Sequence, residues 1–452
     1  LPPGEQWTDA TFPPSVGTIG AVVPSRADGG GSRRASAGGG APDGWSWARG
    51  GGGSLGLESG ADGVLQGRLG DCWLVSAFTV VARHRRLLDQ IFVSRDTDAA
   101  SVYCVRLCRD GRWVPVLLDD WLPVADDDNG NLLFARGKPD ELWVPLLEKA
   151  FAKLYGSYAA LEGGWVHDAL VDLTGGVSET IEIGGDDAPV RAGLWERLLS
   201  YHEAGHLLGA GSPPGDDADT SPGGIVQGHA YALLQLRDVE GHRLLQLSNP
   251  WGGALPVAAV GAWSPWWTPR LTQKLDNAAD AGTSFWLTYD RFVDEFDDVY
   301  ICRLFGGGWL ETKANGVWRG ATAAGCMSYD GAEANPQFHL RVTESTACFI
   351  TLTQRDARGT GALLHHIHVM VAYKGGLRCR RVLRSERVCS SGQYINLRQV
   401  SCEATLERRA EPYTIFVSTY APGEEASFVL AVYSDRPVGL APIDPEAVGV
   451  DG

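Results

Sequence analysis

Hydrophobic positions divide the chain into a polar, glycine-rich beginning and a long remainder that is dense in apolar residues. Residues 1–60 contain glycine tracts at 29–31 and 50–53, frequent proline and alanine, and few side chains that could form a core. This composition predicts a low-complexity linker without stable structure, with Trp45 and Trp47 as its points of attachment to a folded part. Apolar residues become frequent from about residue 64.

The longest apolar run predicts a buried helix. Residues 73–82 are interrupted only by Ser76 and Thr79, so the run is too long and continuous for a surface strand. Asp71 stands just before it, where an N-cap residue is expected. The remaining expectations for this part of the chain are a strand pair at 102–107 and 113–118, a helix at 142–155 and a turn at 172–176.

Strand patterns dominate the second half of the chain. A helix is expected at 194–201, and short strands alternate with turns from about 310 to 437, which is typical of a β-sandwich. Between these parts, strands are expected at 230–236, 244–247, 284–288 and 299–304. The pattern therefore predicts an α+β chain. Its parts are an α-rich lobe at 61–190, a β-rich lobe at 191–305 and an antiparallel β-sandwich at 310–440.

Composition and charge narrow the class of function. Hydrophobic residues make up 44% of the 452 residues and charged residues 21%, as in globular proteins with packed cores. The net charge of −16 argues against nucleic-acid binding through phosphate neutralisation. No apolar run reaches the roughly 18–20 residues that a membrane-spanning helix needs. Nine scattered cysteines favour a reducing compartment such as the cytoplasm.

A cysteine at the start of the buried helix is a candidate nucleophile. The N-terminus of a helix favours the thiolate, and Cys72 occupies that position. Six residues earlier, Gln66 in the segment Gln66-Gly-Arg-Leu-Gly-Asp-Cys72 can provide one donor to an oxyanion, and a backbone N–H near Cys72 can provide the other. A cysteine before apolar residues is more often a small packed hydrophobe, so this segment alone does not decide the function.

A histidine and an asparagine follow in the order that a thiol protease requires. His229 lies between small residues in Gly228-His-Ala-Tyr231, and Asn249 stands in Ser248-Asn-Pro-Trp-Gly252, where Trp251 could shield a His–Asn hydrogen bond. Taken singly, His229 could be a strand cap and Asn249 a turn residue. Together with Gln66 and Cys72 they predict a cysteine endopeptidase.

These motifs together resemble the calpain family of cysteine proteases. The resemblance extends over about 60–305, and segments at 160–164, 168–176, 207–213 and 224–231 are similar to the plant and algal phytocalpains. The later segments Trp318-Arg-Gly320, Asn335-Pro-Gln-Phe338 and 413–425 resemble the β-sandwich that follows the calpain core. The core motifs are Gln66-Gly-Arg-Leu-Gly-Asp-Cys-Trp-Leu74, Glu141-Leu-Trp, Leu147-Glu-Lys-Ala-Phe-Ala-Lys153, Asp172-Leu-Thr-Gly-Gly176, Gly228-His-Ala-Tyr231 and Asn249-Pro-Trp-Gly252.

The resemblance implies a two-lobed, papain-like protease core followed by an antiparallel β-sandwich. It implies a catalytic triad of Cys72, His229 and Asn249, with Gln66 in the oxyanion hole, acting as an intracellular endopeptidase that makes limited cuts in proteins. Phytocalpains carry a multi-spanning membrane region upstream, which this sequence does not contain. The expected location is therefore the cytoplasm, including the cytoplasmic side of a membrane-anchored full-length protein.

The resemblance also implies calcium regulation through sites within the protease lobes. Glu141 matches one ligand of the first-lobe site, whereas Gly63 stands where the family has an acidic residue, with Asp62 one place away. The second lobe has no carboxylate from 252 to 273, and Gly282-Thr-Ser284 replaces the acidic ligands expected there. The sequence thus favours calcium at a first-lobe site formed by Glu141, Asp62 and Gly63, and disfavours a second-lobe site.

Two other functions compete with this interpretation. His202-Glu-Ala-Gly-His206 has the form of a zinc metalloprotease motif, but the glycine- and proline-rich residues that follow predict that its helix ends near Gly205. His365-His-Ile-His368 alternates as a sandwich strand would. A non-catalytic scaffold with the calpain fold is the second alternative, although every triad position is filled.

Overall fold

A computed structural model describes residues 6–20, 45–50, 54–61, 63–94, 100–125, 131–183, 193–216, 218–275 and 283–444. The chain forms two compact units. The first comprises Leu1–Cys108 and Trp113–Leu304, and the second comprises Arg109–Arg112 and Phe305–Gly452.

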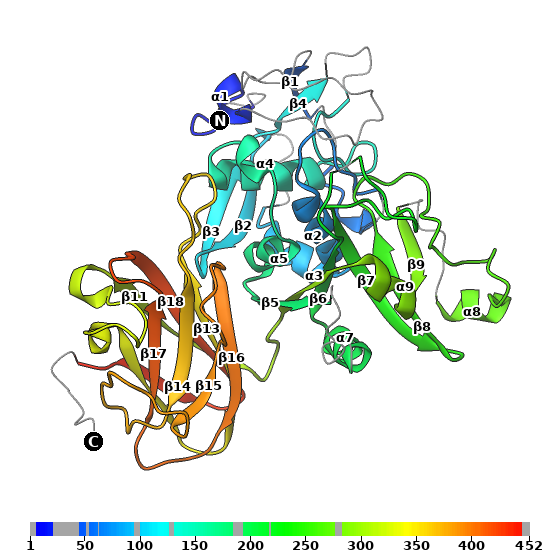
Figure 1. Ribbon diagram of the computed structural model, residues 1–452. Coiled ribbons are helices and arrows are strands. Elements are labelled where there is room, and N and C mark those ends of the chain that lie inside the picture. The colour runs from blue at the N-terminus through cyan, green and yellow to red at the C-terminus, as the bar shows by residue number, and fades with distance from the viewer. Residues whose placement is uncertain are drawn as a thin grey trace. The chain divides into compact units, whose positions relative to one another are not determined.

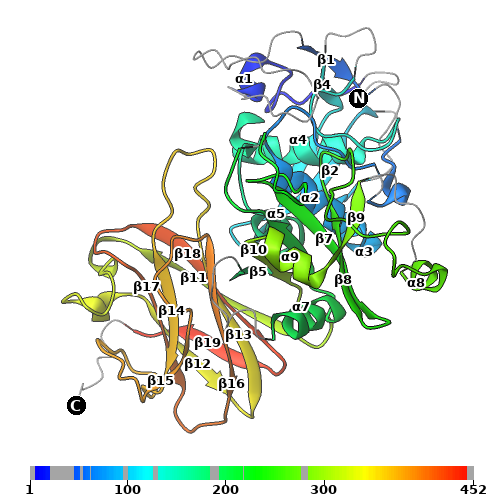
Figure 2. The same cartoon turned by 45° about the vertical axis from the view of Figure 1, so that its right-hand side comes forward.

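The first unit has a helical core built around the predicted buried helix. In α2, every residue after Cys72 is buried, so this helix lies inside the unit rather than on its surface. It contacts α5 and the strands β6 and β7, and Figures 1 and 2 both show α2 beside β7. The helical elements are α2 (Cys72–Ala82), α3 (Arg85–Ile91), α4 (Trp143–Tyr155) and α5 (Val166–Thr174), with the hairpin β2 (Tyr103–Arg109) and β3 (Arg112–Leu118).

A six-stranded antiparallel sheet forms the second part of the same unit. Its strand order is β5-β10-β6-β7-β8-β9, and it has its own hydrophobic core, which includes Leu245, Leu287 and Val299. The strands are β5 (Val177–Glu182), β6 (Leu207–Gly211), β7 (Ala230–Val239), β8 (His242–Ser248), β9 (Ser284–Thr288) and β10 (Asp298–Arg303), and the helices are α7 (Leu194–Glu203), α8 (Pro269–Lys274) and α9 (Tyr289–Glu295). Sheet and helices thus provide the two surfaces that carry the predicted active-site residues.

The described part of residues 1–60 is folded, whereas composition predicts a disordered linker. Phe12 and Ile19, which ends the short helix α1 (Val16–Ile19), are buried in the helical core, and Trp45 and Trp47 pack against that core. They lie at the start of β1 (Trp45–Arg49), which pairs with β4 (Trp121–Ala125). Average composition misses this because a few apolar side chains among many glycines are enough to anchor the segment.

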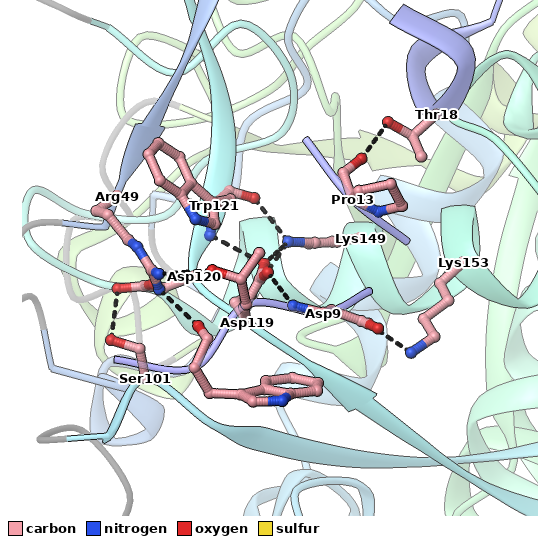
Figure 3. A network of polar contacts seen from close by, with 12 residues as sticks. Asp9, Pro13, Thr18, Arg49, Ser101, Asp119, Asp120, Trp121, Lys149 and Lys153 are labelled. Carbon is pink, nitrogen blue, oxygen red and sulfur yellow. Dashed lines mark hydrogen bonds and ion pairs between the residues drawn. The ribbon is translucent and has the colours of Figure 1, made fainter. Parts of the chain in front are cut away.

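A buried polar network holds residues 6–20 to the first unit (Figure 3). The Asp9 N–H donates to the Asp119 carboxylate at 2.7 Å, and Lys153 pairs with Asp9 at 2.5 Å. The fully buried Lys149 pairs with Asp119 and also donates to the Trp121 carbonyl at 2.7 Å. The N-terminal segment is therefore part of the protease unit, a role that its sequence does not reveal.

Two local expectations differ in detail from the structure. The helix predicted at 73–82 is confirmed, but the Asp71 side chain makes no capping hydrogen bond; its backbone carbonyl accepts from Leu74 N instead. The turn predicted at 172–176 is wrong, because 172–174 form the last turn of α5. The chain leaves that helix through Gly175, whose φ of 69° provides the left-handed C-cap.

The second unit is an antiparallel β-sandwich, as predicted (Figure 2). One sheet has the order β11-β18-β13-β16 and the other β15-β14-β17-β12-β19, with a shared core that includes Trp318, Ile350 and Val417. The strands are β11 (Leu310–Trp318), β12 (Gln337–Val342), β13 (Thr346–Gln354), β14 (Ile367–Ala372), β15 (Arg387–Ser390), β16 (Gln399–Leu406), β17 (Tyr413–Thr419), β18 (Ala426–Ser434) and β19 (Val438–Pro442). Among the helices of the described residues, none is long and apolar enough to cross a membrane.

Candidate active site

Cys72 opens α2, with its thiol at the positive end of the helix dipole. One turn later, Ser76 Oγ donates to the Ala230 carbonyl at 3.0 Å, which ties α2 to the first residue of β7. Since His229 directly precedes Ala230, this buried hydrogen bond joins the helix of the candidate nucleophile to the strand of the candidate base. Nothing in the sequence indicates this role for Ser76.

His229 and Asn249 are brought together, as the motif predicts. His229 Nε2 lies 3.1 Å from Asn249 Oδ1, although the two residues are 20 positions apart. The Trp251 N–H donates to the same oxygen at 3.0 Å, and the Trp251 ring lies 4.4 Å from the His229 ring. The amide oxygen of Asn249 is therefore fixed as an acceptor, which orients the imidazole with a proton on Nε2.

The other imidazole nitrogen is available for proton transfer. His229 is 3% exposed, and within the described part of the chain its Nδ1 atom has no hydrogen-bond partner. Burial is the main cause that lowers the pKa of His229 to about 4, which the hydrogen bond to Asn249 partly opposes. The ring is consequently neutral at neutral pH, and Nδ1 can accept a proton.

Ser212 holds the backbone of His229 in place, a role that sequence reasoning missed. Its hydroxyl donates to the His229 carbonyl at 3.1 Å and accepts from the His229 N–H at 2.9 Å. Gly228, with φ of 60°, allows the backbone just before His229 to pass close to Gly215. A Cβ at this position would lie 2.4 Å from the Gly215 carbonyl oxygen. Ser212 lies in the segment 207–213 that resembles phytocalpains, but its hydrogen bonds to the His229 backbone are evident only in the folded sheet.

The Cys72 thiol contributes to the pKa values of two tyrosines on the sheet. Burial is the main cause that raises the pKa of Tyr231, and the charge of a Cys72 thiolate adds to it. For Tyr300, burial and Asp298 come first, and Cys72 again contributes. Cys72 also packs against the hydrophobic core that includes Ala230 of β7 and Tyr300 of β10, so the nucleophile lies near strands of the sheet.

Gln66 is positioned by bonds from both its backbone and its side chain. The backbone N–H donates to the Pro250 carbonyl at 2.9 Å, next to Asn249, and Nε2 donates to the Leu69 carbonyl at 2.6 Å. That second bond fixes the amide orientation and uses one of two Nε2 hydrogens. The next residue, Gly67, lies so close to the backbone of Phe134 that only glycine fits. A Cβ there would lie 2.3 Å from the Phe134 carbonyl oxygen.

A buried carboxyl pair lies behind the candidate nucleophile. Asp71 and Glu148 are 0% and 1% exposed, and Glu148 accepts the Ala135 N–H at 3.1 Å. Burial raises the pKa of Asp71 to about 7, and burial followed by the Asp71 charge raises the pKa of Glu148. The raised pKa values favour the neutral form of both carboxyl groups, which limits the negative charge next to Cys72.

Of the three predicted calcium ligands, the structure describes Gly63 and Glu141. Asp62 lies outside the described residues, and Gly63 packs near Lys138. Glu141 lies against two glycines: a Cβ at Gly56 would be 2.5 Å from its Cγ, and one at Gly137 would be 3.2 Å from its Oε2. The described residues contain no group of three or more His, Cys, Asp or Glu that could hold a metal.

The metalloprotease motif does not form a metal site. The helix α7 ends at Glu203, and Gly205 takes a φ of 77°, so His202 and His206 do not lie on one continuous helix. His206 Nδ1 accepts the Leu304 N–H at 3.2 Å. Of the other histidine-rich segment, His368 is in β14, whereas His365 and His366 precede the strand.

Comparison with known proteins gives the same assignment for both units. Residues 57–303 match the family described as calpain family cysteine protease, and residues 314–433 match calpain large subunit, domain III. The chain is 41% identical over 402 residues to the calpain-type cysteine proteases ADL1 of Oryza sativa subsp. japonica and DEK1 of Arabidopsis thaliana, covering 83% of this chain and 18% of each relative. It is 30% identical over 438 residues to the human calpain-1 catalytic subunit, covering 85% of this chain and 59% of that protein.

Proposed function

The chain belongs to the calpain family of cysteine proteases, and from this premise we propose that it is an endopeptidase with Cys72 as nucleophile, His229 as general base and Asn249 as the residue that orients the imidazole. The observation that carries the proposal is the His229–Asn249 hydrogen bond, which leaves Nδ1 as the nitrogen available for the thiol proton. The chain spans about a fifth of the length of its plant relatives, so the substrates and partners of the whole protein belong to the proposal as well.

In the acylation step, Cys72 Sγ attacks the carbonyl carbon of the substrate peptide, and His229 Nδ1 takes the thiol proton. The carbonyl π electrons move to oxygen, where Gln66 Nε2 and the Cys72 backbone N–H donate to the oxyanion. As this intermediate collapses, the C–N bond breaks and the leaving amine takes the proton from His229. The product is a thioester on Cys72.

Deacylation repeats the same exchange with water. The water oxygen attacks the thioester carbon while His229 accepts a proton from the same water. The protonated ring then returns that proton to the departing Cys72 sulfur. Asn249 holds the ring in one orientation through both steps, and the Trp251 ring covers the hydrogen bond between them. The side chains of Cys72, His229, Asn249 and Gln66, together with the Cys72 backbone N–H, provide every protein group that the two steps use.

Gln66→Ala tests the oxyanion assignment. We expect kcat to fall roughly 10²–10³-fold, the usual loss for one oxyanion donor. Alkylation of Cys72 by iodoacetamide passes through no oxyanion, so its rate should stay close to that of the unchanged protein. Gln354→Ala is a matched control, because Gln354 is equally buried and also donates to backbone carbonyls, but in the sandwich. Equal losses of turnover and alkylation in Gln66→Ala would show a folding defect instead.

We further propose limited cleavage of proteins inside the cell, in the cytoplasm or on the cytoplasmic side of a membrane-anchored full-length protein. An odd number of cysteines, nine, scattered along the chain supports a reducing location. A non-catalytic scaffold is the alternative, and it predicts that Cys72 is alkylated while casein stays intact. The His229–Asn249 hydrogen bond and the fixed Gln66 amide favour an enzyme, because a scaffold has no need of them.

Calcium regulation is the last part of the proposal. Glu141, with main-chain oxygens of the loop that includes Gly56 and Gly63, would hold the ion, whose charge would stabilise the loop leading to Gln66. The backbone of this loop is already tied to the start of α4, since the Leu142 N–H donates to the Ser54 carbonyl at 3.0 Å. A hard cation with one carboxylate and neutral carbonyls binds weakly.

Titration calorimetry of the full chain with calcium, in a Cys72→Ser background, checks this site. We expect one weak site that is lost in Glu141→Ala. Asp280→Ala should leave it unchanged; Asp280 lies outside the described residues and is the nearest carboxylate before Phe285. Two comparable sites, or binding that survives in Glu141→Ala, would contradict the proposal.

A further inference from the structure

Two cysteines of the β-sandwich lie with their sulfur atoms in contact. Cys389 Sγ donates a hydrogen bond to Cys402 Sγ over 3.3 Å, and the residues are 13 positions apart. A disulfide bond needs about 2.05 Å between the sulfurs, so side-chain rotation and a small backbone adjustment of roughly 1 Å would join them. Both residues carry free thiols in the structure.

The pair bridges the two sheets at one edge of the sandwich. Cys389 is in β15, the edge strand of the five-stranded sheet, and Cys402 is in β16, the edge strand of the four-stranded sheet. Residues 391–398 connect the strands, and β15 and β16 contact each other. A bond between these sulfurs would therefore fasten the sheets where neither edge strand has a further strand beside it.

The two thiols differ in how far solvent reaches them. Cys389 is partly exposed, whereas Cys402 is 7% exposed and belongs to the hydrophobic core. The hydrogen bond from Cys389, and then burial, raise the pKa of Cys402. An oxidant therefore reaches Cys389 first, and Cys402 is positioned to resolve the product.

We propose that Cys389 and Cys402 form a modification site, at which a hydroperoxide oxidises the pair to an intramolecular disulfide. Cys389 attacks the peroxide, the O–O bond breaks, and Cys389 sulfenic acid and one water form. Cys402 Sγ then attacks the Cys389 sulfur and displaces its hydroxyl, which leaves as a second water with the Cys402 proton. In total, two thiols and one hydrogen peroxide give one disulfide and two waters.

Cys348 is the alternative partner for Cys402 that the structure offers. It lies on β13, the neighbour of β16, where the two strands pair Cys348 with Ala404 and Ile350 with Cys402. Burial raises the pKa of Cys348 to about 12, and it is 3% exposed. An oxidant has poorer access to this thiol, so Cys348 remains reduced and provides the matched control.

The test uses the full chain with Cys72→Ser, so that the catalytic thiol cannot be oxidised or digest the sample. After hydrogen peroxide treatment and blocking of the remaining thiols, trypsin should yield peptide 388–398 joined to peptide 399–408, and the joined species should be lost on reduction. Cys389→Ser should abolish it, and Cys348→Ser should leave it intact. Because the bond restricts the unfolded chain, the Tm of the sandwich transition should rise by on the order of 10 °C on oxidation.

Three results would overturn the inference. One is recovery of both peptides unlinked from peroxide-treated protein. A second is oxidation of Cys389 to sulfinic acid without a cross-link, and a third is a cross-link from Cys402 to Cys348. None of these measurements depends on proteolytic activity, so they stand apart from the test of the active site.

Discussion

Replacing Cys72 by serine should abolish cleavage of casein, with a loss on the order of 10⁶-fold in kcat, as when a triad nucleophile is removed. The substitution changes one atom at the start of α2, so the buried helix and the Ser76–Ala230 hydrogen bond should remain. A serine hydroxyl gives up its proton far less readily than a thiol, and the neutral His229 is too weak a base to compensate. The measurement is steady-state turnover of a quenched casein substrate, with unfolding curves to show that the fold is retained.

Two further variants separate chemistry from general damage. His229→Ala should lose about as much activity as Cys72→Ser, because members of a triad act as a unit. Cys104→Ser should be close to unchanged, since Cys104 lies in β2 and is a partly buried cysteine like Cys72. Robust activity in Cys72→Ser would end the cysteine mechanism, and inhibition by a zinc chelator would then direct attention to His202 and His206.

The sequence alone predicts those parts of the fold and site that depend on local pattern. The helix after Cys72, the strand β9 and the alternating strands of the sandwich are evident from hydrophobic periodicity. Cys72, His229 and Asn249 are recognised because each stands in a short motif, and their order matches a known chemistry. The hydrogen bond between His229 and Asn249 follows that expectation closely.

Features that arise from tertiary contact could not be predicted in this way. Ser76 and Ser212 are ordinary hydroxyl residues in sequence, and their roles follow from the approach of α2 and β6 to the strand that begins beside His229. Cys389 and Cys402 show no motif, because their contact depends on how two sheets meet at an edge. The folding of residues 6–20 depends on contacts with side chains more than 100 positions away.

Lys149→Met should strongly destabilise the first unit, by about 3–5 kcal/mol in the free energy of unfolding. Lys149 and Asp119 are both 0% exposed, and burial lowers the pKa of Lys149 while the Asp119 carboxylate opposes that effect. Methionine fills similar space but leaves the Asp119 charge buried without its cation. It also removes the donor to the Trp121 carbonyl, shown in Figure 3.

A double-mutant cycle decides whether the ion pair or the packing carries this cost. Asp119→Asn removes the charge, and its amide oxygen can keep one of the two backbone donors that now bond to different carboxylate oxygens, Asp9 N to Oδ2 and Trp121 N to Oδ1. Asp119→Asn combined with Lys149→Met should therefore be less destabilised than the sum of the single variants by about 1–3 kcal/mol. Arg85→Ala, which breaks an exposed ion pair within α3, should change stability by about 0.5 kcal/mol or less. Calorimetric unfolding of the full chain in a Cys72→Ser background measures all four, and strict additivity would show that the cost comes from packing alone.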